Sequence, residues 1–229
     1  MRLCYQQAYV RFGFRTYLEL LDESVRDKLG DEEESYLDKA SSSAIRVQEM
    51  VDAVLGYARV EARGGAFEPV DLEAILEGVK DSLWKEITCF RAQITSEGLP
   101  KVVADPSQME QLFQNLIGNA LKFTPDKGAV SVVAEMLEPD EKPEQTIAGT
   151  NGRYLKVSVS DTGIGINPDN LSRIFGEFEK IENSFARNYP GTGLGLSLTK
   201  NLIEMHKGKV WAESQGEGKG STFHFMIPL

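Results

Sequence analysis

The sequence predicts an α+β protein in which an N-terminal antiparallel helical hairpin, residues 1–64, precedes a mixed α/β domain, residues 65–229. Two observations predict this division. An apolar repeat of 3.5 residues runs through the first region, whereas amphipathic helices and short strands of alternating polarity fill the second. The pair Gly64-Gly65 separates the two patterns. A length of 229 residues accommodates one ordinary domain and a smaller one.

The apolar repeat of the first region has the spacing of a seam between helices. Its members alternate three and four residues apart: Leu37, Ala40, Ala44, Val47, Val51, Val54 and Ala58. An earlier helix has its own apolar side, formed by Phe14, Leu18, Leu21 and Val25. Gly30-Asp31 is the expected turn, with Asp31 as N-cap and Glu34 three residues later. Because two such hairpins form a four-helix bundle, the seam indicates a homodimer. Packing against the chain's own second domain is the alternative.

The second region alternates strands and helices. Strands are expected at about 67–70, 91–95, 101–104, 130–136, 154–160, 209–213 and 222–227, and helices over 71–90, 106–123 and 194–205. The helix over 106–123 has the clearest start, because Asp105 is a suitable N-cap, Pro106 occupies the first helical position and Gln108 the third. Residues 138–153 are polar and contain Pro and Gly, which predicts an exposed loop.

Charge and composition restrict the function. The formal charge of −10 argues against a nucleic-acid partner, since phosphate backbones require concentrated Lys and Arg. A site for an anion such as ATP must then be locally basic or built from backbone amides. Cys4 and Cys89 lie far apart without metal-like spacing, which is typical of a reducing, cytoplasmic setting. We find no signal-peptide pattern and no apolar run long enough to span a bilayer.

The helix over 106–123 carries the first group of candidate site residues. Opposite a broad apolar face runs a polar stripe of Gln111, Asn115, Asn119 and Lys122. A solvated surface is the alternative, but surface stripes favour Glu and Lys over Asn, a weak helix former. An Asn carbonyl oxygen can bind Mg²⁺ while phosphate oxygens and waters complete its octahedron, and a nearby Lys can contact a phosphate.

Three further segments contain glycines beside polar residues. Asp161 ends a strand and is followed by Gly163 and Gly165, which suits the close approach of a flat ligand to backbone. The run 191–196, Gly-Thr-Gly-Leu-Gly-Leu, opens a helix and can direct amides at an anion, after a polar stretch over 176–190 that could close as a lid. Thr222 follows Gly220 at the start of the last strand. Taken singly, an ordinary turn or strand is the alternative for each.

In this order the segments resemble the N, G1, G2 and terminal G-x-T boxes of the GHKL ATPase superfamily, and residues 174–178 resemble the F box of histidine kinases. The resemblance extends from about residue 71 to residue 229 and implies a Bergerat-type open α/β sandwich with a mixed sheet that binds ATP and Mg²⁺. It implies Asn119 as magnesium ligand, Asn115 and Lys122 as catalytic phosphate contacts, and Asp161 on the adenine amine. The residues implied in cofactor binding are Asn119, Asp161, Gly163, Gly165, Gly191, Thr192, Gly193, Leu194, Gly195, Leu196 and Thr222.

The position four residues before Asn119 separates two branches of that superfamily. Its hydrolases place a general-base Glu there, whereas this chain has Asn115, which cannot take a proton from water at neutral pH. The kinase branch is therefore preferred over gyrase-like or mismatch-repair-like ATPases. The resemblance then implies transfer of the ATP γ-phosphoryl group to a histidine, for relay to a response regulator or a histidine-bearing phosphotransfer protein. A non-catalytic ATP-binding scaffold is the alternative.

The helical region also resembles the dimerisation region of phytochrome-like kinases, through residues 17–21 and 51–60. The resemblance places Tyr5 where those kinases have their phosphoacceptor histidine. The two histidines of the chain, His206 and His224, lie in the last region, where we expect core or surface roles. Three interpretations remain open: the chain phosphorylates a histidine on a partner, it is a regulatory pseudo-kinase, or its start is misassigned.

Overall fold

The computed structural model of the chain describes residues 24–25, 29–30, 32–41, 43–44, 47, 67–138, 152–176, 179 and 193–229. The chain divides into two compact units, and the larger one contains the described residues from Phe67 onward. In the smaller unit, residues 32–41, 43–44 and 47 are helical. The hairpin, its dimer, the boundary at residue 64 and the place of Tyr5 stay predictions, since most of the residues that decide them lie outside the described ones.

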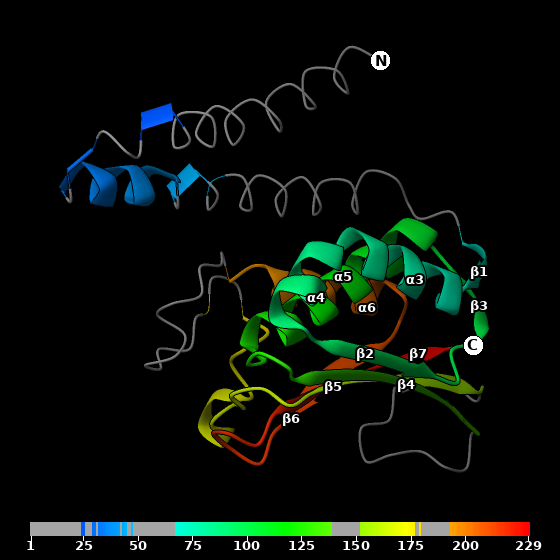
Figure 1. The fold of residues 1–229 in the computed structure, drawn as a ribbon. Coiled ribbons are helices and arrows are strands. Elements are labelled where there is room, and N and C mark those ends of the chain that lie inside the picture. Colours follow the sequence, from blue (N-terminus) through cyan, green and yellow to red (C-terminus); the bar gives the residue numbers. More distant parts are fainter. Residues whose placement is uncertain are drawn as a thin grey trace. The chain divides into compact units, whose positions relative to one another are not determined.

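A five-stranded mixed sheet forms one layer of the larger unit (Figure 1), which confirms the predicted α/β architecture. Its order is β2 (Gln93–Glu97), β4 (Ala129–Leu137), β5 (Tyr154–Asp161), β7 (Ser221–Pro228) and β6 (Lys209–Glu213). β2 runs parallel to β4, and the other neighbours are antiparallel. A separate antiparallel pair joins β1 (Glu68–Asp71) to β3 (Lys101–Ala104). The last strand therefore lies inside the sheet, beside β5.

Helices cover one face of this sheet (Figure 1). They are α3 (Leu72–Ser82), α4 (Trp84–Phe90), α5 (Pro106–Phe123) and α6 (Gly195–Met205). The single helix predicted over 71–90 is wrong, because the helix is interrupted at Leu83. The strand predicted over 91–95 begins later, at Gln93, because Arg91 ends α4 in the left-handed conformation with φ 49°. α5 has the predicted bounds, with Asp105 accepting a hydrogen bond from the Gln108 amide at 3.0 Å.

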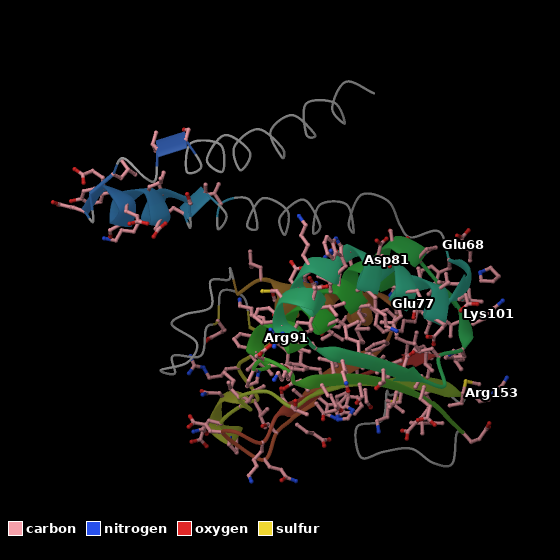
Figure 2. All side chains as sticks on the ribbon, in the orientation of Figure 1. Glu68, Glu77, Asp81, Arg91, Lys101 and Arg153 are labelled. Carbon is pink, nitrogen blue, oxygen red and sulfur yellow. The ribbon has the colours of Figure 1, made fainter. Side chains whose placement is uncertain are left out.

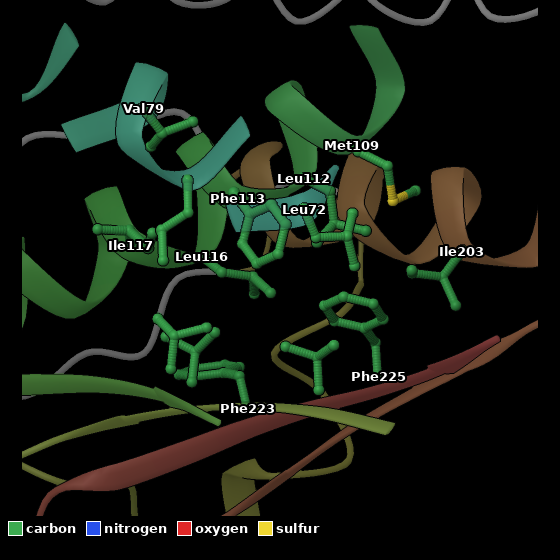
Figure 3. Close-up of a cluster of buried hydrophobic side chains, with 14 of the residues drawn as sticks. Leu72, Val79, Met109, Leu112, Phe113, Leu116, Ile117, Ile203, Phe223 and Phe225 are labelled. Atoms are coloured by element: carbon green, nitrogen blue, oxygen red, sulfur yellow. The ribbon is translucent and has the colours of Figure 1, made fainter. Parts of the chain in front are cut away.

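The core lies between the helices and the sheet (Figure 3). Alternate residues of β5, among them Val157 and Val159, face the helices, as strand geometry requires. Phe113 of α5 meets Phe225 of β7 edge to face, with ring centroids 6.1 Å apart. This packing holds α5 against the inner face of the sheet, and so fixes the polar stripe of α5 relative to the end of β5.

Charged side chains of the described residues lie almost entirely at the surface (Figure 2). Exposed pairs such as Lys101 with Asp71, at 3.4 Å, are typical of this surface. Among the described residues, Asp161 is the one buried carboxylate, with 9% of its surface exposed. In that same part of the chain no helix is both long and apolar enough to cross a bilayer. The other described acidic side chains are in contact with solvent, so the burial of Asp161 indicates a specific role for its carboxylate.

Candidate functional site

The Asp161 carboxylate is held by the chain on three sides. Its Oδ1 accepts hydrogen bonds from the Gly163 amide at 2.8 Å and the Ser221 amide at 3.2 Å. Its Oδ2 accepts from the Ser221 hydroxyl at 2.5 Å. A carboxylate has about four acceptor positions. Three are therefore filled within the chain, and one position on Oδ2 remains for a single donor from outside.

The electrostatics of Asp161 reflect two opposed effects. Burial raises its pKa above the usual range of an aspartate, because the charged form loses water. The hydrogen bonds from the Ser221 hydroxyl and from the Gly163 and Ser221 amides act in the opposite direction. The fold thus places a desolvated carboxylate in a fixed orientation, which is the arrangement that strengthens a hydrogen bond to a ligand.

Thr222 does not contact this carboxylate, and its predicted part in cofactor binding stays a prediction. Along β7, Ser221 is paired with Asp161 and Thr222 with Ser160, so Thr222 lies on the opposite face of the sheet. Its hydroxyl lies 3.0 Å from that of Ser160. Sequence reasoning missed Ser221, although a signal existed: Ser221 is an even number of residues from the apolar Phe223 and Phe225 and therefore shares their inward face.

Two glycine turns pack tightly at the end of β5. The Gly220 amide donates to the Gly163 carbonyl at 3.1 Å, and the Gly218 amide donates to the Ile164 carbonyl at 2.7 Å. Gly165 has φ 70°, and a Cβ there would collide with the Gly216 carbonyl oxygen. A side chain at Gly163 is excluded by lack of space, since an added Cβ would lie 2.5 Å from Asp161 Oδ1. Gly163 therefore adjoins the carboxylate, and Gly165 packs against the turn that precedes Ser221.

The predicted stripe of α5 meets the start of α6. Asn115 Nδ2 donates to the Gly195 carbonyl at 3.3 Å, and its Oδ1 accepts from Gln111 Nε2 at 3.3 Å. A Cβ added to Gly195 would lie 3.9 Å from both Asn115 Oδ1 and Asn119 Nδ2. The structure thus brings Asn115, Asn119 and Gly195 together, from segments some 80 residues apart in the chain.

The C-terminal end of α5 meets the turn that follows Asp161. The Phe123 carbonyl accepts a hydrogen bond from the Ile164 amide at 3.0 Å. Lys122 lies beside it, half-buried, with Nζ 5.3 Å from the centroid of the Phe123 ring. One helix therefore connects the asparagine pair with the buried carboxylate.

The remaining predicted residues belong to the loop before α6. Gly193 has φ 75°, a conformation that favours glycine, and Leu194 is buried. Leu196 packs partly buried against the core. Gly191, Thr192 and most of the predicted lid over 176–190 lie outside the described residues. Their proposed roles stay predictions.

The residues present fit a magnesium ion that takes few protein ligands. No group of three His, Cys, Asp or Glu side chains in the described ranges could hold a metal ion. A dedicated carboxylate cage is thus not formed there. Asn119 is half-buried, with its Nδ2 toward Gly195, and its amide group also carries an oxygen, which suits an ion whose other ligands are phosphate oxygens and water.

Comparison with known proteins agrees with this geometry. Residues 104–229 match the family model described as histidine kinase-, DNA gyrase B- and HSP90-like ATPase. Cyanobacterial phytochrome A of Nostoc sp. is 36% identical over 214 residues, 93% of this chain and 26% of that protein. The adaptive-response sensory kinase SasA of Synechococcus elongatus is 29% identical, over 85% of this chain and 48% of that protein. The solved structure of full-length ShkA in complex with AMPPNP has a TM-score of 0.63 and 28% identity, over 98% of this chain and 45% of that one.

A two-layer sandwich with a buried carboxylate at a strand end and an asparagine stripe on its central helix defines a nucleotide-binding domain of the GHKL class. The chain belongs to the family of histidine kinase-, DNA gyrase B- and HSP90-like ATPases, and its domain is of the sensor histidine kinase type. The chain spans about a quarter of the length of the phytochrome relatives that it matches, 26% in both.

Proposed function

We propose that this chain is the ATP-binding catalytic portion of a two-component sensor histidine kinase. The observation that carries the proposal is the single open acceptor position on the buried Asp161 carboxylate. An exocyclic amine, as in adenine, supplies one donor of the required kind. A carbonyl at the same place on the ring, as in hypoxanthine, meets the carboxylate with a second acceptor and is rejected.

Phosphoryl transfer depends on positioning and charge more than on covalent chemistry of the protein. In the proposed complex, Asn119 holds Mg²⁺ through its side-chain oxygen, and the bound ion supplies charge neutralisation to the phosphates. Lys122 lies on the same helix face one turn later, where its ammonium group contacts a phosphate. Asn115 keeps one amide hydrogen beyond the bond to Gly195. That hydrogen is directed to a phosphate oxygen, so the three residues act together.

The acceptor of the phosphoryl group is proposed to be a histidine on a partner, with relay to a response regulator. His206 and His224 do not suit that role. Both are buried, with 5% and 7% of their surface exposed, and each has one ring nitrogen hydrogen-bonded within the domain. A homodimer through the helical region remains part of the proposal.

Substitution of the site residues tests the nucleotide assignment. Asn119→Ala and Asp161→Ala are expected to abolish ATP binding in titration calorimetry with Mg²⁺ present. Gln114→Ala, on the exposed side of the same helix, is the matched control and is expected to bind like the unchanged chain. Full affinity in either site variant would contradict the assignment.

Labelled ATP tests the transfer step. The chain is incubated with γ-labelled ATP alone and together with a candidate histidine-bearing partner, and acid-labile label is measured on each protein. Label on the partner that disappears with Asn119→Ala supports the kinase. Binding of ATP with label on neither protein would instead identify a scaffold that binds nucleotide without transfer.

A further inference from the structure

Ser214, which none of the predicted motifs contains, lies where two turns meet beside the Asp161 site, the turn after β5 and the turn between β6 and β7. It directly follows β6 and is half-buried. Its hydroxyl donates to the Gly220 carbonyl at 2.7 Å and accepts from the Ile166 amide at 3.0 Å and the Gly216 amide at 3.3 Å. A serine hydroxyl offers one donor and two acceptor positions. The chain therefore uses all three.

Two partners of Ser214, Ile166 and Gly220, belong to segments that determine the position of Asp161. Ile166 ends the turn that begins at Asp161, and this turn provides the Gly163 amide that the carboxylate accepts. Gly220 directly precedes Ser221, whose amide and hydroxyl are the other two donors to the carboxylate. The Ser214 hydroxyl thus joins both sources of the hydrogen bonds that orient Asp161.

The packing between the two turns leaves little freedom to relax. A Cβ on Gly220 would collide with the Asp161 carbonyl oxygen, and one on Gly165 would collide with the Gly216 carbonyl oxygen. The backbones are therefore in direct contact, without intervening side chains. A shift of one turn relative to the other is transmitted to the carboxylate, because no flexible group lies between them.

We infer that Ser214 is a positioning residue for recognition of the nucleotide base, acting through Ile166 and Gly220 on the one open acceptor position of Asp161. The inference rests on the proposed function. Without the Ser214 hydroxyl, two amides and one carbonyl lose their shared partner, and the turns around Asp161 keep only their backbone hydrogen bonds to one another. The base amine then meets a carboxylate that is no longer held in a single orientation.

The test compares two nucleotides that differ at the amine. ATP and inosine triphosphate are titrated calorimetrically into the unchanged chain and into Ser214→Ala, with Ser96→Ala as control. Ser96 is also half-buried and donates one hydrogen bond, to Glu73 at 2.7 Å, on a strand outside the site. Ser214→Ala is expected to weaken ATP binding about tenfold, the order of one hydrogen bond to a charged group, and to leave inosine triphosphate binding unchanged.

The ratio of the two affinities distinguishes positioning from support of the fold. A lower melting temperature of Ser214→Ala with an unchanged ATP preference would overturn the inference. Ser214→Thr keeps the hydroxyl and is expected to restore the preference, and a preference in Ser214→Thr as low as in Ser214→Ala would also overturn it. Should Ser214→Ala fail to fold, Ser214→Cys, a weaker donor, is expected to give an intermediate preference, and full preference there would refute the role. An unchanged chain that binds neither nucleotide would refute the proposed function itself.

Discussion

Asp161→Asn isolates the ligand-binding role of the carboxylate from its role in the fold. The asparagine oxygen can still accept the Gly163 and Ser221 amides, and its amide nitrogen can donate to the Ser221 hydroxyl, which then acts as acceptor. The open position on Oδ2 becomes an N–H group. An incoming amine therefore meets a donor where the unchanged chain presents an acceptor.

The expected size of the effect follows from that one contact. A hydrogen bond to a charged group contributes roughly 1.5–3 kcal/mol, so its loss weakens ATP binding by about tenfold to 150-fold. The stability of the fold should not fall in parallel. Burial raises the pKa of Asp161, which means that the folded chain keeps a carboxylate at neutral pH against a desolvation cost, and the neutral amide removes that cost.

Calorimetric titration with ATP and thermal unfolding of the same samples measure both quantities. Asp81→Asn, an exposed aspartate on α3 (Figure 2), is the matched control and is expected to change neither. Acidification provides a second check, because protonation through the raised pKa of Asp161 removes the acceptor in the unchanged chain but not in Asp161→Asn. Unweakened ATP binding by Asp161→Asn, or the same acid sensitivity in both proteins, would refute the reasoning.

Two further perturbations test the surroundings of the site. Gly163→Ala places a Cβ 2.5 Å from the Phe123 carbonyl oxygen and is expected to lower the unfolding free energy in urea by about 1–3 kcal/mol. Gly78→Ala, which has open space around it in α3, is the control and should raise it by about 0.8–1 kcal/mol. The same change in unfolding free energy for both variants would contradict the packing at Gly163. Burial lowers the pKa of His224; the charge of Lys156 lowers it further, and the charges of Glu213 and Glu135 oppose the shift. As the pH falls below about 6.5, the imidazole therefore takes up a proton in the unfolded chain before it does so in the folded chain. The unfolding free energy of the unchanged chain should therefore decline more steeply with acid than that of His224→Gln. Fluorescence of Trp211, whose ring is stacked on His224 with centroids 5.0 Å apart, reports the unfolding. Identical slopes in the two proteins would exclude His224 as the titrating group.

Local signals in the sequence predicted local structure well. The start of α5 depends on Asp105 and Pro106, which act within one turn, and its predicted bounds are confirmed. The interruption at Leu83 has no such signal, since neither Gly nor Pro lies within four residues of it. The sheet order is also non-local: the position of β7 between β5 and β6 depends on pairing between segments some 60 residues apart.

The contrast between local and non-local signals also explains which site residues the sequence could predict. Asp161, Gly163 and Gly165 lie within five residues of one another, so the turn after β5 keeps them together. The motif resemblance points to Thr222, whereas the register of β7 against β5 determines that Ser221 faces Asp161. Ser214 carried no signal at all, because a serine after a strand is typical of any turn. Its role depends on hydrogen bonds to residues that only the folded chain brings near.

The geometry of Asn115 adds a physical reason why this site does not suit hydrolysis. Its amide group donates to the Gly195 carbonyl and accepts from Gln111, so it joins α5 to the first turn of α6. A glutamate at that position, the general base of the hydrolase branch, would direct a carboxylate at the Gly195 carbonyl, acceptor against acceptor. The Gly195 carbonyl already accepts from the Thr199 hydroxyl at 3.0 Å and is held in place. In this fold the residue at 115 therefore stabilises the junction of α5 and α6, and a base could occupy the position only if that junction were built differently.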